Sequence, residues 1–163
     1  MKILVLNGPN LNLLGQREPD VYGALTLHEI NQQLARHGEE LDRLRGIGEG
    51  MQKGERIKLY FYQSNHEGVL VDTIQGAPRS YEGIVYNPAA HTHYSIALRD
   101  AIAAIPIPVV EVHLSDIAAR EGFRAVSVME EVCLAQFKGR GALSYCDALD
   151  ALVGHLDAQG DRG

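Results

Sequence analysis

The sequence predicts an α/β domain built on a doubly wound parallel sheet, and three observations lead to this class. Short apolar runs alternate with helical patterns along the whole chain. Five of these runs have strand length and helices separate them, the pattern of a parallel sheet with helices on both faces. The chain has 163 residues, 45% hydrophobic and 22% charged, which suits a single domain over residues 1–163 with one core.

The first third of the chain contains one strand and one long helix. Lys2 to Leu6 reads as the strand, and Asn7 to Gly23 as a long loop. Thr26 to Glu29 has the pattern of a capping box, and the apolar residues that follow recur at helical spacing through Leu44. A glycine-rich connection around residues 46–56 then leads to the second strand.

The rest of the chain repeats this alternation. The other strands are expected at Ile57–Tyr62, Gly83–Tyr86, Pro108–Leu114 and, with a weaker pattern, Val132–Phe137. The other helices are expected after a second capping box at Ser64–Glu67, from about Thr92 to Ala104, and from Leu143 to Leu156.

Composition excludes several classes of partner. The net charge of −6 and the lack of a sustained basic run argue against nucleic acid and anionic membranes. No apolar stretch approaches the roughly 20 residues that span a bilayer, and the short run after Met1-Lys2 lacks the features of a signal peptide. A cytoplasmic protein is therefore expected. Cys133 and Cys146 form no CxxC pair and are expected as reduced, buried thiols.

Polar residues gather just after the predicted strands, where ligands bind in doubly wound sheets. They are Asn10, Asn12, Arg17 and Tyr22 after the first strand, Asn87, Thr92 and His93 after the third, and Glu111, His113, Ser115, Arg120 and Arg124 in and after the fourth.

Arg17 and Tyr22 form the first candidate pair. A tyrosine is a poor base while its pKa is about 10, but a nearby guanidinium favours the phenolate. The pair lies in a glycine-flanked loop, a kind of segment that can close over a small substrate. The alternative is a surface loop in which Tyr22 covers apolar surface and Arg17 is solvated.

Glu111 and His113 form the second pair. They lie on the same face of a strand, so the carboxylate is placed to accept a hydrogen bond from one ring nitrogen and to favour the imidazolium, which suits a general acid. The backbone N–H groups of Leu114 and Ser115, with the Ser115 hydroxyl, would cradle a carboxylate or phosphate. The alternatives are a core histidine for His113 and a helix cap for Ser115.

The remaining candidates have simple structural explanations. Asn87 and His93 fit a turn and the start of a helix, and Asp100 and Arg124 fit solvated surface. His91 and His93 have no carboxylate or cysteine nearby in sequence, so no metal site is expected. A metal-free acid–base site without a cofactor is the simplest account of the strand-end residues.

With these residues in view, the chain resembles type II 3-dehydroquinate dehydratase, a small flavodoxin-like enzyme of the shikimate and quinate pathways. The likeness runs from Ile3 to about Ser127 and includes LNGPNLNLLGQREPDVYG, QSNHEG, NPAAHTHYSIALRDA and EVHLSDIAAREGFRAVS. It implies dehydration of 3-dehydroquinate without a Schiff base, and a homododecamer built as a tetramer of trimers. Whether the role would be aromatic amino-acid biosynthesis or quinate breakdown stays open.

The resemblance also implies roles for single residues. Tyr22 would be the base, Arg17 its activating cation, Asn10 the group that holds a water at the enolate, and His113, oriented by Glu111, the acid. Asn87, Leu114 and Ser115 would hold the substrate carboxylate. His93, Asp100 and Arg124 would hold ring hydroxyls or complete the pocket, with Asp100 contributed by a neighbouring subunit.

Some positions depart from the usual pattern of that family. The connection at 46–56 is longer, Ala89 replaces a common glycine, and the stretch from Gln136 to Gly141 has lost some glycines. These changes bear on assembly more than on chemistry. The alternatives are a flavodoxin-like binding domain for phosphates or nucleotides, which would need a Gly/Ser/Thr-rich first loop, and an inactive relative, which would have lost Tyr22, Arg17 or His113.

Overall fold

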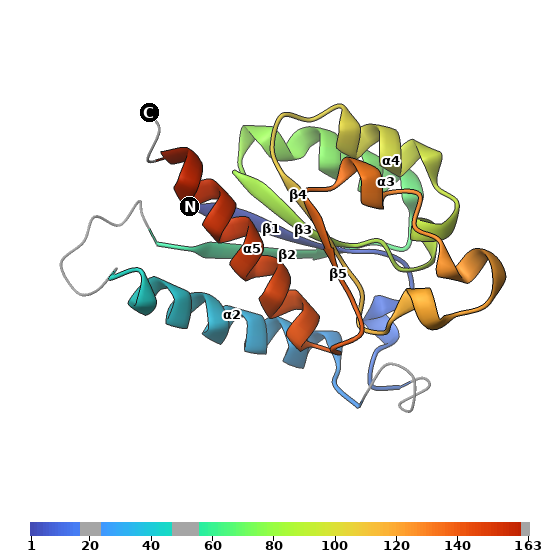
Figure 1. The fold of residues 1–163 in the computed structure, drawn as a ribbon, viewed down its shortest axis with the longest axis horizontal. Coiled ribbons are helices and arrows are strands. Elements are labelled where there is room, and N and C mark those ends of the chain that lie inside the picture. The colour runs from blue at the N-terminus through green and yellow to red at the C-terminus, as the bar shows by residue number, and fades with distance from the viewer. Residues whose placement is uncertain (17–23, 47–55, 161–163) are drawn as a thin grey trace.

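The computed structural model describes residues 1–16, 24–46 and 56–160, and within them it has one five-stranded parallel sheet (Figure 1). The strands are β1 (Lys2–Asn7), β2 (Lys58–Gln63), β3 (Gly83–Asn87), β4 (Val109–Val112) and β5 (Ala135–Phe137). The helices are α2 (Leu27–Leu44), α3 (Glu67–Gly76), α4 (Ile96–Ala103) and α5 (Leu143–Gly160). All neighbouring strands pair in parallel, in the order β2-β1-β3-β4-β5.

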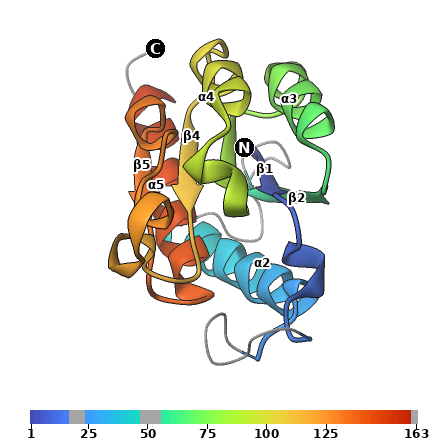
Figure 2. The same ribbon diagram turned by 90° about the vertical axis from the view of Figure 1, so that its right-hand side faces the viewer.

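Helices cover both faces of the sheet, which confirms the predicted fold class. Figures 1 and 2 show α2 and α5 on one face and α3 and α4 on the other. Successive side chains of a strand point to opposite faces, so Ile3 and Val5 of β1 enter the core beneath α2 and α5. Leu4 and Leu6 enter the core beneath α3 and α4.

The strand order is that of flavodoxin-like folds and reverses at β1 and β3, which lie side by side. Asn7 at the end of β1 is in register with Asn87 at the end of β3. The loops beyond these residues are in close contact, because a Cβ on Gly8 would lie 2.5 Å from the carbonyl oxygen of Pro88. Glycine at position 8 therefore allows the two strand ends to meet at the point where a ligand is expected.

The strand limits differ modestly from the sequence prediction. β2 begins one residue later than expected. β4 is shorter than expected at both ends, and β5 is shorter at its start. β2 is an edge strand whose Tyr60, Phe61 and Tyr62 are exposed, so helices bury only the central strands on both faces.

The first predicted capping box is confirmed and the second is wrong. Thr26 accepts a hydrogen bond from the backbone N–H of Glu29, whose carboxylate accepts one from the Thr26 N–H. Ser64 instead lies before the helix, where its backbone N–H donates to the Asn7 carbonyl. Because Ser64 is held against β1, α3 begins at Glu67 with His66 as an N-cap that makes no side-chain capping bond.

The helix expected from Thr92 to Ala104 is divided into two parts. A 3-10 turn spans Ala89–His93, and α4 begins at Ile96 after Ser95, whose hydroxyl caps the N–H of Leu98. The break has a tertiary cause, since the Thr92 carbonyl accepts a hydrogen bond from the N–H of Val128, in a distant segment, rather than from the following turn.

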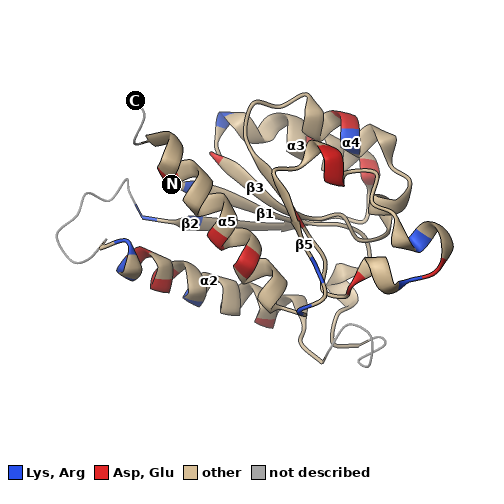
Figure 3. Ribbon diagram, viewed as in Figure 1, with Lys and Arg blue, Asp and Glu red and all other residues tan. Residues whose placement is uncertain are grey.

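Charged residues of both signs are interspersed along α2 (Figure 3). Arg45 at the end of that helix pairs with Asp157 of α5 at 2.5 Å and so links the two helices on this face. In the described part of the chain no helix has the length and apolarity required to cross a membrane.

Candidate active site

A cavity of about 200 Å³ lies at the carboxyl ends of the central strands. It is lined by Pro9, Asn10, Leu11, Leu14, Asn87, Ala89, Ala90, His93, His113, Leu114, Ser115, Ile117, Arg120 and Arg124. Eight of the residues selected from the sequence line it: Asn10, Asn87, His93, His113, Leu114, Ser115, Arg120 and Arg124. The fold therefore gathers side chains from the ends of β1, β3 and β4 around one space.

The first loop supplies Asn10 in an unusual backbone conformation. Its φ is 65°, in the left-handed region that asparagine tolerates better than most residues. The Asn10 N–H donates to Oδ1 of Asn65 at 2.9 Å, and its carbonyl accepts from the Leu13 N–H at 3.0 Å. These bonds fix the loop after β1 at the cavity wall.

Asn87 is held from behind the cavity by a buried hydrogen-bond network. Its Nδ2 donates to the Tyr145 hydroxyl at 2.8 Å, and that hydroxyl donates to Oδ1 of Asn7 at 2.7 Å. The Oδ1 of Asn87 accepts from the Ala89 N–H at 3.1 Å. Tyr145 is fully buried, and burial raises its pKa, so its hydroxyl stays protonated. Sequence reasoning missed Tyr145, which lies on α5 far along the chain.

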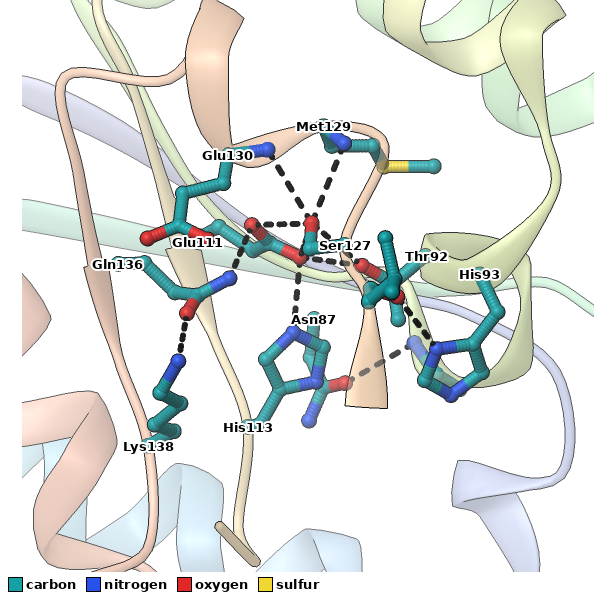
Figure 4. Close-up of polar contacts among 12 residues, drawn as sticks. Asn87, Thr92, His93, Glu111, His113, Ser127, Met129, Glu130, Gln136 and Lys138 are labelled. Atoms are coloured by element: carbon teal, nitrogen blue, oxygen red, sulfur yellow. Dashed lines mark hydrogen bonds and ion pairs between the residues drawn. The ribbon is translucent and has the colours of Figure 1, made fainter. Parts of the chain in front are cut away.

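Glu111 and His113 form the pair expected from their spacing. Nε2 of His113 lies 2.8 Å from Oε1 of Glu111, and both side chains are buried (Figure 4). Nε2 faces the carboxylate, and His113 also lines the cavity, so this buried histidine lies between Glu111 and the open space.

Other segments complete the surroundings of Glu111. Thr92 and Ser127 donate to its carboxylate, the latter at 2.9 Å, and Nε2 of Gln136 donates to Oε2 at 2.8 Å. Sequence reasoning missed Ser127 and Gln136 as contributors, because they come from separate segments that only folding brings to β4 (Figure 4).

The pKa of Glu111 reflects this environment. Burial raises it, but the hydrogen bond and the charge of His113 and the hydrogen bonds from Thr92 and Gln136 lower it. The net effect holds the pKa of Glu111 below its usual value, so the residue is an anion at neutral pH. An anionic Glu111 accepts a hydrogen bond from His113 and stabilises the imidazolium.

The segment after β4 contributes polar and cationic groups. Ser115 Oγ accepts a hydrogen bond from Nη2 of Arg120 at 2.7 Å. Arg120 and Arg124 both line the cavity, and Nδ1 of His93 lies 2.8 Å from the Val126 carbonyl. Two guanidinium groups at one wall favour an anionic ligand. Arg120 was named among the polar residues after the fourth strand, but the sequence assigned it no role.

Two of the selected residues, Arg17 and Tyr22, lie outside the described residues. Asp100 is exposed on α4, where its carboxylate accepts from Nη1 of Arg99 at 3.2 Å, and it does not line the cavity.

The cysteines and histidines show no metal-binding arrangement among residues 1–16, 24–46 and 56–160. Cys133 and Cys146 are free and half-buried rather than fully buried, which corrects the sequence prediction. Burial raises the pKa of Cys133 to about 12, so it is a thiol at neutral pH. His91 is buried, and burial lowers its pKa.

A doubly wound α/β domain with a buried carboxylate–imidazole pair beside a cavity lined by guanidinium groups has the groups that general acid–base catalysis on an anionic ligand uses. The particular family follows from comparison. The profile of the family described as "Dehydroquinase class II" matches residues 1–153. The chain therefore belongs to the class II dehydroquinase family, as the sequence motifs predicted.

Individual relatives agree with this assignment. A curated protein of Acaryochloris marina named 3-dehydroquinate dehydratase is 52% identical over 157 residues, 96% of each chain. One of that name from Ruegeria pomeroyi is 51% identical over 160 residues, 98% of each chain. The crystal structure of a type II dehydroquinase from Butyrivibrio crossotus is similar with a TM-score of 0.79 at 42% identity, covering 93% of this chain and 97% of the other.

Proposed function

We propose that this protein is a hydro-lyase that dehydrates 3-dehydroquinate to 3-dehydroshikimate through an enolate, with a tyrosine base and a histidine acid and without a Schiff base. The observation that carries the proposal is the Glu111–His113 pair, whose histidine lines the cavity together with Arg120 and Arg124. Family membership and the names of the relatives at about half identity support the substrate.

The acid step is assigned to His113. Elimination of the hydroxyl β to a ketone requires a proton for the departing oxygen. With Nε2 held by Glu111 at 2.8 Å, Nδ1 is the nitrogen that would donate. As the enolate re-forms the carbonyl and the new carbon–carbon double bond, the carbon–oxygen bond breaks and the proton from Nδ1 makes the departing oxygen water. The neutral imidazole then gains a proton from solvent and the protonated base loses one to solvent, so no net proton is consumed.

The base step is assigned to Tyr22, with Arg17 stabilising its phenolate. The phenolate would take the proton from the carbon next to the ketone, and the negative charge would pass to the carbonyl oxygen as an enolate. Asn10 at the cavity wall would hold a water against that oxygen. No lysine is among the described residues that line the cavity, which supports a route without an imine.

Substrate binding is assigned to the wall of the cavity that contains Arg120 and Arg124. Asn87, Leu114 and Ser115 would hold the substrate carboxylate, with Arg120 donating to Ser115. His93 and Arg124 would contact ring hydroxyls. Asp100 does not line the cavity of its own chain, so its predicted role requires a second copy, consistent with the proposed homo-oligomer of trimers.

The direct test is ultraviolet absorbance after 3-dehydroquinate is added to the purified protein, because the product is a conjugated enone. We expect turnover that survives borohydride added with substrate. Inactivation by borohydride would contradict the imine-free route, and the absence of turnover by correctly assembled protein would contradict the proposed function.

The two proton-transfer residues are tested by Tyr22→Phe and His113→Ala. Each variant should retain its fold and lose at least about 100-fold in kcat, the usual contribution of a general acid or base. His28→Ala is the matched control, because His28 is exposed on α2. Wild-type kcat in either variant would show that its assigned role is wrong.

A further inference from the structure

Lys138 and Gln136 lie directly behind the acid pair and have no role in the proposed reaction. Gln136 of β5 is in register with Glu111 of β4, and its Nε2 donates to Oε2 of Glu111 at 2.8 Å. Nζ of Lys138 donates to Oε1 of the same amide at 2.6 Å. Figure 4 shows that hydrogen bonds connect Lys138 to Gln136 and Gln136 to Glu111, which contacts His113.

The chemistry of the two end groups determines the orientation of the Gln136 amide. An ammonium group has donors and no acceptor, and an ionised carboxylate has acceptors and no donor. Only an amide with its oxygen toward Lys138 and its nitrogen toward Glu111 satisfies both neighbours. Lys138 thus determines which end of Gln136 faces the carboxylate.

The oriented amide restricts Glu111 to the role of acceptor. Ser127 Oγ accepts from the N–H groups of Met129 and Glu130 at 3.1 Å, so its own proton is directed to Glu111. With Ser127 and Gln136 both donating, Glu111 is held as an anion, and the proton between Glu111 and His113 resides on Nε2 of the histidine. That arrangement presents Nδ1 to the cavity.

Lys138 is well placed for this role because its ammonium group contacts the Gln136 amide. Among the residues that the structure describes, it forms no ion pair with a carboxylate. It is half-buried and does not line the cavity. A change in activity on substitution of Lys138 would therefore not come from a lost contact with substrate.

We propose that Lys138 is a positioning residue for the catalytic acid, acting through Gln136 and Glu111 on His113. This inference rests on the proposed function, since it concerns the same acid. The other titratable groups that face Glu111 are Tyr86 on β3 and Cys133 before β5. Burial raises the pKa of both, with that of Cys133 at about 12, so both stay neutral across the working range.

The first test compares Lys138→Met, Lys138→Arg and the control Lys58→Met, which removes the same charge from an exposed position on β2. Lys138→Met should lower kcat by about three- to tenfold, part of the contribution of a general acid, with KM within about twofold. Lys138→Arg restores a donor and should recover kcat. Wild-type kcat in Lys138→Met, or no recovery with arginine, would overturn the proposal.

A double-mutant cycle tests whether Lys138 acts through Gln136. Gln136→Met removes the bridge and should lower kcat as much as Lys138→Met does, and it also provides the test if Lys138→Met fails to fold. The double variant should be no worse than Gln136→Met alone, because two residues of one chain of contacts are not additive. Multiplied losses would overturn the proposal.

A pH profile separates orientation from simple packing. Gln136→Glu preserves shape but opposes two carboxylates unless one is protonated. Its kcat relative to wild type should rise as the pH is lowered, whereas a ratio independent of pH would contradict the mechanism. Inactive wild-type protein would contradict the proposed function, and an active wild type with unaffected variants would contradict this inference alone.

Discussion

At the scale of single residues, Asn87 shows how a cavity-lining group is held by others. Its amide is fixed on one side by the Tyr145 hydroxyl and on the other by the Ala89 N–H. Ala89 itself has φ of 52°, a left-handed conformation that disfavours a side chain. The hydrogen bond to Asn87 therefore helps to hold a strained turn at the mouth of the site.

The first prediction concerns Tyr145→Phe. Loss of the hydroxyl leaves Oδ1 of Asn7 without this donor and Nδ2 of Asn87 without this acceptor, both in buried surroundings. The free energy of unfolding should fall by about 1–3 kcal/mol, and kcat/KM should fall because Asn87 is no longer held. Urea unfolding and the enone assay measure the two effects.

The matched control is Tyr62→Phe, which removes a hydroxyl from an exposed side chain on the edge strand. It should leave both stability and turnover close to wild type. An equal loss in the two variants would mean that the network around Asn7 and Asn87 has no special role.

Among the elements of the fold, the starts of α2, α3 and α4 depend on different signals. α2 begins with a complete capping box at Thr26 and Glu29, and the hydrogen bonds of Thr26 lower the pKa of Glu29. The start of α4 is set by Ser95, and the start of α3 by contacts of the preceding loop with β1. A local motif therefore fixed one helix start, and tertiary contacts fixed another.

The second prediction follows from the cap of α2. Thr26→Ala should lower the free energy of unfolding by about 1 kcal/mol, the usual value of an N-cap side chain. Thr26→Ser retains the accepting oxygen and should stay close to wild type. Chemical denaturation would reveal the difference, and equal stability of the alanine and serine variants would show that the hydroxyl bond contributes nothing.

At the scale of the whole molecule, Glu111 joins segments that are distant in sequence. Its carboxylate contacts Thr92 before α4, Ser127 after β4 and Gln136 on β5. Because its pKa is lowered by folding, its contribution to stability is present above the usual glutamate pKa of about 4.3. That contribution is lost as the pH falls through the lower pKa of the folded state.

The third prediction is the acid dependence of Glu111→Gln. The variant should be less stable than wild type at neutral pH, and the difference should narrow as the pH falls below about 4. Urea unfolding across that range measures it. Glu39→Gln, at an exposed position on α2, is the control, and its free energy of unfolding should change with pH as that of the wild type does. A gap for Glu111→Gln that stays constant with pH would contradict the lowered pKa.

The family, the α/β class and the position of most candidate groups could be predicted from the amino-acid sequence. The alternation of apolar runs and helices predicts the doubly wound sheet, and period-two alternation predicts that Glu111 and His113 share a face. The rule that ligands bind at strand ends selected Asn10, Asn87 and Ser115, and all three line the cavity.

The side chains that support these groups became known from the folded chain alone. Thr92, Ser127 and Gln136 meet at Glu111, and Tyr145 meets Asn7 across most of the chain. Likewise, Ser64 fits a local capping pattern but is held against β1. The physical reason is that propensity and periodicity act over a few residues, whereas hydrogen bonds between distant segments depend on how the layers pack.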